Sequence, residues 1–331
     1  MPIDFDNARL TAAINTMPVV PKQLGALGWF AVDSVDTTVV KIERQDEASF
    51  GVVAAVPRGA PGESAGRARR DGELFELAHI PMHDTLWAEE VQNQRAFGTE
   101  GELTRLDTEL AKLQLRQKNR IAATLESMRI GALKGVVLNK DGTEIVNFWT
   151  KFGLTANTVS LNLATGSKLR GTFDGWRSKI CDELGDDEPV AYESLIGEDA
   201  FRTLISNAEA REEYLAQVKA GTAQAGAALG DTFDYGGIRW RKAAARASQS
   251  STVSRIETNK AYIVPMGVPD LLIGRFGPST WIDGVNTMGL PLYAKAKENH
   301  EGTGYDVWAQ SNPLFAPTRP RAILQATFTL A

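Results

Sequence analysis

The sequence has few of the side chains that usually carry catalysis, metal binding or covalent cross-linking. Its 331 residues include one cysteine, Cys181, and three histidines. A single cysteine excludes an intrachain disulfide and favours synthesis in a reducing compartment. No run of about 18 apolar residues is present, so no transmembrane helix is predicted. The N-terminal residues are partly acidic and lack an apolar core, so we expect no signal peptide.

Strong charge of either sign is also missing. The chain has 36 basic and 41 acidic residues, which leaves a formal net charge of −5. This balance argues against a protein whose main task is to grip nucleic acid. The apolar content of 43% and the charged content of 23% are ordinary for a globular protein. The length favours more than one domain.

The residues that could perform chemistry are isolated from one another. His79 and His83 flank Pro81, which breaks the helix that would place both imidazoles on one face. Cys181 has no nearby histidine to activate it, so a buried thiol is the simpler interpretation. GTGYDVW (302–308) contains Gly-x-Gly but lacks the third glycine of a dinucleotide site. We therefore expect no enzyme activity, no metal and no cofactor.

The N-terminal region, residues 1–34, combines proline and glycine with large apolar side chains. Leu24, Leu27, Trp29 and Phe30 lie in a stretch whose prolines and glycines predict an irregular, extended path. Such an arm cannot bury these side chains by itself. We expect it to lie on another surface.

Residues 35–84 predict a long β-hairpin. Two stretches with good strand formers, 39–56 and 73–82, flank PRGAPGESAGRARRDG (57–72), which contains no large apolar residue. An isolated two-stranded ribbon is marginally stable in water. The hairpin is therefore expected to rest on another surface.

Residues 99–131 predict the longest helix. Leucines recur at spacings of three and four between residues 103 and 113, Thr99 can cap the first turn, and Gly131 is predicted to end the helix. The apolar stripe is narrow and the remaining positions are largely charged. One side of this helix is therefore expected to be buried.

The region from residue 172 to 260 mixes helical and strand patterns. YGGIRWRKAA (235–244) predicts a strand with Ile238 and Trp240 on one face and Arg239 and Arg241 on the other. No aromatic platform alternates on the same face as the arginines, as a single-stranded nucleic-acid site would require. A solvated strand face or a subunit contact is the better interpretation.

The C-terminal stretch NTMGLPLYAKAKENHEGTGYDVWAQSNPLFAPTRPRAIL (286–324) resembles the signature of the phage major capsid protein E family, the lambda-like branch of tailed-phage shell proteins. Four further stretches occur in the order of the family: DTTVVKIE (36–43), VQNQRAFGTEGE (91–102), TLESMRIGALKG (124–135) and YGGIRWRK (235–242). The resemblance covers nearly the whole chain. Its motifs are structural rather than catalytic.

The resemblance implies an α+β fold, namely the capsid fold named after phage Hong Kong 97. It assigns residues 1–34 to an N-terminal arm, 35–84 to an extended β-hairpin loop, 85–152 to a peripheral domain with the spine helix 99–131, 153–308 to an axial domain, and 309–331 to a C-terminal strand that returns to the peripheral domain.

The resemblance further implies a major capsid protein that self-assembles as hexamers and pentamers into an icosahedral shell around the double-stranded DNA of a tailed phage. Its place is the virion, after assembly in the host cytoplasm. The implied partners are further copies of the chain, a portal protein, a decoration protein and a separate scaffolding protein, because the chain starts directly with the arm. Contact with packaged DNA is expected to be weak, and no membrane is involved. The candidate subunit-contact residues are Trp29, Phe30, Arg67, Arg69, Arg70, Glu102, Glu109, Arg239 and Arg241.

Two alternatives stay open on the sequence. One keeps the fold and makes the chain an encapsulin-like shell protein of a bacterial nanocompartment. The other is an enzyme of mixed α/β type, which needs a pocket with convergent polar groups.

Overall fold

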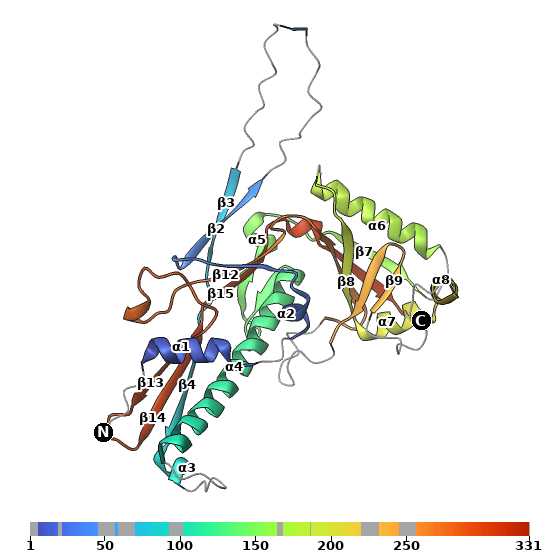
Figure 1. Cartoon of the computed structure of the whole chain (residues 1–331). Helices are drawn as coiled ribbons and strands as arrows, with labels where there is room; N and C mark the ends of the chain where they lie inside the picture. Colours follow the sequence, from blue (N-terminus) through green and yellow to red (C-terminus); the bar gives the residue numbers. More distant parts are fainter. Residues whose placement is uncertain are drawn as a thin grey trace. The chain divides into compact units, whose positions relative to one another are not determined.

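A computed structural model of the chain describes residues 6–18, 22–45, 57–58, 70–92, 102–163, 168–185, 187–219, 232–244 and 256–330. The chain forms two compact units, each built from segments that are distant in sequence (Figure 1). Unit 1 comprises Met1–Val40, Phe75–Arg129 and Ile273–Phe315, and unit 2 comprises Lys41–Leu74, Ile130–Leu272 and Ala316–Ala331.

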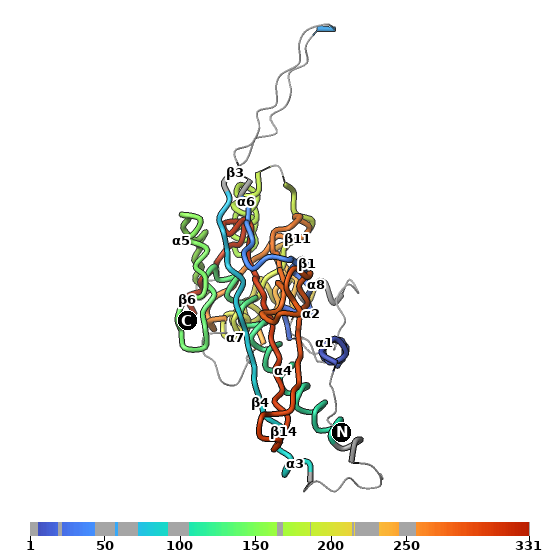
Figure 2. The backbone as a smooth tube through the Cα atoms, turned by 90° about the vertical axis from the view of Figure 1, so that its left-hand side faces the viewer, coloured from blue at the N-terminus to red at the C-terminus, as the bar shows by residue number. Residues whose placement is uncertain are grey.

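Unit 1 joins the beginning of the chain to strands from its last sixty residues. It contains α1 (Asn7–Thr16), α2 (Gln23–Leu27), β1 (Ala31–Ser34), β4 (Ile80–Trp87), α3 (Ala88–Gln92), η1 (Ile282–Gly284), β13 (Tyr293–Glu298) and β14 (Gly304–Ser311), with most of α4 (Glu102–Lys134), β12 (Leu272–Phe276) and part of β15 (Pro313–Pro317). Strands β13, β14 and β4 form an antiparallel sheet in that order, and β1, β12 and β15 form a second one in which β1 runs parallel to β12. Figure 2 shows β4 and β14 running side by side.

The leucine stripe of α4 packs against the β13-β14-β4 sheet. Leu110 and Leu113 belong to a buried cluster with Leu86, Ala296 and Val307. This contact confirms the apolar face predicted for the long helix. Burial of such side chains, at roughly 25 cal/mol per Å² of apolar surface, is what fixes the helix on the sheet.

The C-terminal end of α4 differs from the prediction. The helix continues through Gly131 to Lys134, and Gly135 follows it with a φ of 81°. Close packing, rather than a helix stop, requires glycine at position 131. A Cβ on Gly131 would lie 2.9 Å from the Cα of Val137. Thr99, the predicted cap, lies outside the described residues.

The predicted hairpin divides into two parts. Strands β2 (Val39–Gln45) and β3 (Arg70–Glu76) form a two-stranded sheet, which we call the β2–β3 ribbon. Strand β4, which follows the ribbon in the chain, is not part of it and pairs antiparallel with β14. Residues 80–84 of the predicted loop therefore belong to the sheet of unit 1. Pro81 is tolerated there because β4 is the edge strand of that sheet.

Unit 2 is built around a six-stranded sheet with the order β7-β16-β11-β8-β10-β9. Besides most of the ribbon it contains β5 (Val136–Leu138), β6 (Glu144–Asn147), α5 (Phe148–Phe152), β7 (Thr158–Asn162), α6 (Leu169–Leu184), β8 (Ala191–Ile196), α7 (Glu198–Ser206), α8 (Ala208–Lys219), β9 (Thr232–Tyr235), β10 (Ile238–Lys242), β11 (Lys260–Met266), η2 (Pro320–Ala322) and β16 (Leu324–Thr329).

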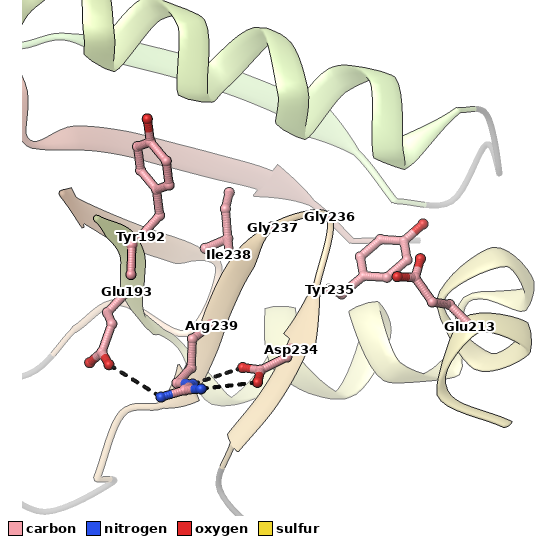
Figure 3. Close-up of a pocket in the computed structure, with 10 residues that line it drawn as sticks. Tyr192, Glu193, Glu213, Asp234, Tyr235, Gly236, Gly237, Ile238 and Arg239 are labelled. Atoms are coloured by element: carbon pink, nitrogen blue, oxygen red, sulfur yellow. Dashed lines mark hydrogen bonds and ion pairs between the residues drawn. The ribbon is translucent and has the colours of Figure 1, made fainter. Parts of the chain in front are cut away.

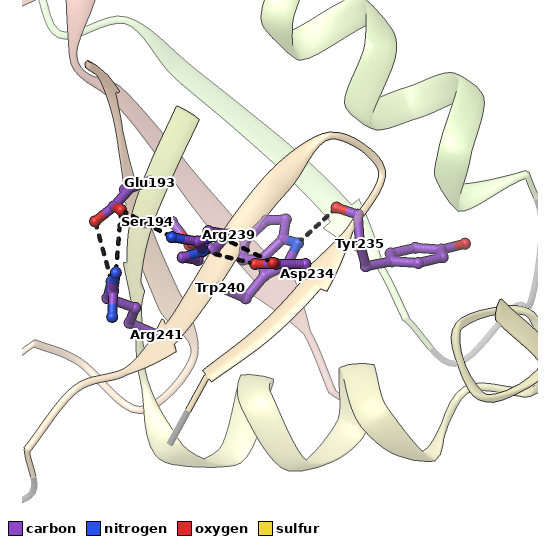
Figure 4. A network of polar contacts seen from close by, with 7 residues as sticks. All are labelled: Glu193, Ser194, Asp234, Tyr235, Arg239, Trp240 and Arg241. Atoms are coloured by element: carbon purple, nitrogen blue, oxygen red, sulfur yellow. Dashed lines mark hydrogen bonds and ion pairs between the residues drawn. The ribbon is translucent and has the colours of Figure 1, made fainter. Parts of the chain in front are cut away.

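An aromatic core joins α6 to this sheet. The ring of Phe173 lies 5.0 Å from that of Trp240, and the ring of Trp176 lies 6.0 Å from that of Phe328. Both α6 residues are buried, as the amphipathic pattern predicted. Helices α6 and α7 lie on opposite sides of the sheet (Figure 4).

The boundaries of the units differ from those expected for the axial domain and the C-terminal strand. Strand β13 and the first part of β14 fall within 153–308, yet both strands belong to unit 1 with the first part of α4. Strand β16 pairs with β7 and β11 in unit 2 rather than returning to the sheet of α4. The aromatic core explains this choice, because Phe328 of β16 also lies 6.2 Å from Trp240.

Candidate subunit-interaction surfaces

The arm, the first segment predicted to lie on another chain, is folded onto unit 1. Asp6 caps α1 by accepting a hydrogen bond from a first-turn amide. Thr11 and the backbone of Ala294 exchange two hydrogen bonds of 3.2 Å, and Asn15 donates to the carbonyl of Leu292 at 2.9 Å. Helix α1 is thus fastened to β13 and to the residue just before it.

Lys118 of α4 binds the C-terminal end of α1. Its Nζ donates to the carbonyl oxygens of Ile14, Asn15 and Met17 at 2.6, 2.9 and 2.7 Å. The last carbonyls of a helix lack intrahelical partners and carry partial negative charge, so an ammonium group is well suited to them. Burial lowers the pKa of Lys118 below its ordinary value.

Glu126 of α4 binds the N-terminal end of α2 in the complementary way. Its carboxylate accepts the backbone N–H groups of Leu24 and Gly25 at 2.5 and 3.1 Å and pairs with Arg129 at 3.4 Å. The Glu126 side chain is 2% exposed. The Arg129 guanidinium lies 4.5 Å from the ring centre of Phe315, and burial lowers its pKa while the charge of Glu126 opposes that shift.

Phe30, a predicted subunit-contact residue, is part of the core of unit 1. It is 7% exposed, and its ring meets that of Phe315 edge to face at 5.4 Å. Trp29 beside it is half-buried. The described arm residues, 6–18 and 22–34, therefore form two helices and a strand on their own subunit instead of an irregular path. Phe30 needs no second copy to be buried.

The β2–β3 ribbon carries the arginines proposed for contact with a neighbour. Arg70 is the first residue of β3, whereas Arg67 and Arg69 lie outside the described residues. Ile42 is buried, but Leu74 is 60% exposed. Within the described part of the chain, neither strand of the ribbon pairs with a third strand.

Two further contact candidates, Glu102 and Glu109, lie on α4. Glu102 is its first residue. Glu109 is 9% exposed and pairs with Lys112 of the same helix at 2.6 Å. The Glu109 carboxylate is therefore engaged within its own subunit.

Arg239 and Arg241 lie on β10 and form ion pairs with acids on the adjacent strands (Figure 4). Arg239 binds Asp234 through two hydrogen bonds of 2.9 and 3.2 Å, and Arg241 binds Glu193 through two of 3.0 Å. The hydrogen bonds that Arg239 donates to Asp234 raise the pKa of Arg239. The structure brings the two arginines together through Glu193, which also lies 3.7 Å from Arg239.

Next to this network is a pocket of about 310 Å³. Burial, together with the negative charge of nearby glutamates, raises the pKa of Tyr235 to about 12, so its hydroxyl stays protonated at neutral pH. Among the described residues that line the pocket there is no serine, cysteine or histidine. Figure 3 shows its lining residues, which are Ala191, Tyr192, Glu193, Glu213, Asp234, Tyr235, Gly236, Gly237, Ile238 and Arg239.

The two histidines and the cysteine considered as possible chemical groups each have a different neighbour in the structure. His79 lies 2.8 Å from the side-chain oxygen of Asn312, His83 lies 3.4 Å from Asp306, and Cys181 is half-buried with a tyrosine hydroxyl 3.0 Å away. Among the described residues no group of three acidic, histidine or cysteine side chains is placed to bind a metal ion. None of the helices in the described part is long and apolar enough to span a membrane.

Sequence reasoning missed Lys118 and Glu126, the residues that attach the arm. Both are charged residues on a helix for which only the leucine stripe was expected to be buried. One signal was present, because Glu126 and Arg129 are the only charged residues in the stretch 125–133. A close pair of opposite charges in an apolar stretch indicates a buried ion pair rather than a solvated face.

Comparison with known proteins places the whole chain in one family. Residues 6–328 match the family model described as phage major capsid protein E. The chain is 22% identical over 351 residues to the major capsid protein of Salmonella phage Felix O1, covering 97% of this chain and 95% of that protein.

Solved structures with the same fold include shells of other phages. The mature capsid of bacteriophage PhiM1 matches with a TM-score of 0.55 and 10% identity over 96% of this chain and 90% of that one. The capsid of cyanophage P-SCSP1u matches with a TM-score of 0.51 and 8% identity over 96% and 91%. These likenesses establish a mixed α+β fold of the Hong Kong 97 type.

The family match extends over nearly all of the chain, and it defines a structural role in the virion rather than an enzymatic one. The chain belongs to the phage major capsid protein E family and is a major capsid protein that forms the icosahedral shell of a tailed phage.

Proposed function

We propose that copies of this chain assemble as hexamers and pentamers through the β2–β3 ribbon, and that the shell they form encloses double-stranded DNA. The observation that carries this proposal is that no third strand pairs with the ribbon in the described residues, although its Ile42 and Phe75 are buried within the subunit. In the described residues the ribbon is a two-stranded sheet with an exposed Leu74, and such a sheet is marginal by itself. A neighbouring copy can supply the surface that it lacks.

In this proposal the parts of the fold take distinct roles in the shell. The ribbon is the base of the extended loop, α4 is the spine helix, unit 1 is the peripheral domain and unit 2 is the axial domain. The arm stays on its own subunit, because Lys118 and Glu126 satisfy the ends of its helices. The glycine-, proline- and arginine-rich stretch 57–72 adapts to slightly different neighbours in pentamers and hexamers.

Weak contact with the packaged DNA follows from the charges. The chain has a net charge of −5. Arg239 and Arg241 pair with Asp234 and Glu193 and offer little free positive charge to phosphates. A separate scaffolding protein, a portal protein and a decoration protein complete the proposed set of partners.

Electron microscopy of the full chain, expressed with its neighbouring genes, tests the proposal together with a variant that lacks residues 59–70. We expect closed particles that contain DNA from the intact chain. From the deletion we expect a soluble subunit with an unchanged circular dichroism spectrum and no closed particles. Normal particles from the deletion variant would refute the role of the extended loop, and particles filled with an enzyme instead of DNA would refute the proposed content.

A further inference from the structure

The loop between β12 and β13 concentrates exposed apolar side chains. Ile282 is 90% exposed, Val285 64%, Met288 59% and Leu290 43%. These four are a third of the twelve large apolar side chains that are exposed among the described residues, and they lie within nine positions. We call residues 282–290 the apolar loop. Single exposed apolar residues are normal on a protein surface, but such a cluster indicates a contact site.

The apolar loop is held in a defined conformation. The backbone N–H of Gly289 donates to the carbonyl of Val35 at 2.9 Å, and that of Leu290 donates to the Tyr293 hydroxyl at 2.9 Å. Gly289 lies so close to the backbone that a Cβ on it would be 1.9 Å from the carbonyl oxygen of Phe276. A loop that is already ordered loses little conformational entropy when a partner covers it.

The charges of the loop narrow the choice of partner. Asp283 is its only charged residue, and the Asp283 carboxylate accepts a hydrogen bond of 3.2 Å from Asn7 of α1. A nucleic-acid contact would need basic side chains, and the loop has none. A surface dominated by isoleucine, valine, methionine and leucine, with one carboxylate beside them, is typical of a protein–protein interface.

We propose that the apolar loop is a contact surface for a second copy of this chain in the assembled shell. The inference rests on the role of the chain as a shell protein. The chain forms a shell from many copies of itself, so the surface of a neighbouring copy is available to every apolar loop. Ring-forming contacts between identical subunits join two different surfaces, so the loop need not be complementary to itself.

The double variant Ile282→Asp/Met288→Asp tests the proposal in the full chain expressed with its neighbouring genes. Because both side chains are exposed, we expect a soluble subunit with an unchanged unfolding midpoint and a yield of closed particles at least tenfold lower. Val190→Asp is the matched control, since Val190 is 85% exposed but lies in unit 2 outside the loop. A normal particle yield from the double variant would overturn the proposal.

A photo-crosslinking amino acid at position 282 identifies the partner directly. In assembled particles we expect a product with twice the chain mass of 35.9 kDa, whose second peptide comes from this chain. Particles that give no such product, or a product only with a scaffolding or decoration protein, overturn the inference and leave shell assembly intact. Failure of the unmodified chain to form particles would instead remove the proposed function on which the inference rests.

Discussion

The arm and the β2–β3 ribbon both combine large apolar side chains with turn-forming or charged residues, and both were predicted to lie on another copy. The structure separates them. In the arm, Phe30 is 7% exposed and both helices are attached to α4. In the ribbon, Leu74 is 60% exposed and the two strands pair only with each other within the described residues.

This difference indicates that the unpaired backbone groups at the ends of the arm helices determine where the arm lies. A helix leaves backbone N–H and C=O groups unpaired at its ends, and burying them without partners is costly. Lys118 and Glu126 supply partners of the right charge on the same subunit. The ribbon satisfies its inner backbone groups by pairing, and its outer edges stay available to another chain.

The largest effect is expected for Phe30→Ala. If the arm belongs to the core of its own subunit, loss of the ring beside Phe315 should lower the free energy of unfolding by about 3–5 kcal/mol. Chemical denaturation of the unassembled subunit measures it. Val32→Ala, at an exposed position of β1, should change stability by less than about 0.5 kcal/mol. If the Phe30 variant is as stable as the intact chain, the result would favour contact of the arm with another subunit instead.

Glu126→Ala should cost somewhat less, about 2–4 kcal/mol, because it leaves the backbone N–H groups of Leu24 and Gly25 and the Arg129 guanidinium without their acceptor. Limited proteolysis should then cleave the arm faster than in the intact subunit. Asp107→Ala, an exposed carboxylate on the same helix, is the control and should leave both measurements unchanged. An arm that stays protected in the Glu126 variant would contradict its attachment by this carboxylate.

Leu74→Ser tests whether the exposed apolar side chain of the ribbon serves assembly rather than the stability of its own subunit. Because the side chain is exposed, the free subunit should keep its unfolding free energy within about 0.5 kcal/mol. The yield of closed particles should fall, since the apolar surface offered to a neighbour is lost. A clear loss of stability in the free subunit would place Leu74 in a core that the ribbon shares with its own chain.

The smallest effect is expected for charge reversal of Arg67, Arg69 and Arg70 together. Exposed ion pairs contribute about 0–1 kcal/mol each and weaken as salt screens them. Assembly yield of the triple variant should therefore drop more at low salt than at high salt, as measured by light scattering. A yield independent of salt would argue that these arginines do not meet charges on a neighbouring copy.

Local patterns predicted several elements correctly. The leucine spacing indicated the buried face of α4, and the alternation in 235–244 predicted that Ile238 and Trp240 of β10 are buried. These signals work because the periods of a helix and a strand place every fourth or every second residue on one face. The end of α4 was mispredicted at Gly131, because a small residue can serve close packing as well as a helix stop.

Among the contact candidates, sequence reasoning named the residue types but not their surroundings. Glu109 and Arg241 look like free charges along the chain, yet Lys112 and Glu193 pair with them. Lys118 was counted as part of a solvated face, although it caps α1. A one-dimensional pattern cannot distinguish a charge that faces water from one that faces the end of another helix.

By itself the sequence determined the family, the long helix and the alternating strands, because these depend on motifs and periods within continuous stretches of the chain. Only the tertiary structure decided that β16 completes the six-stranded sheet, that β4 leaves the ribbon for β14, and that the arm lies on its own subunit. These choices depend on contacts between residues up to hundreds of positions apart, such as Thr11 with Ala294, whose energies no local pattern contains.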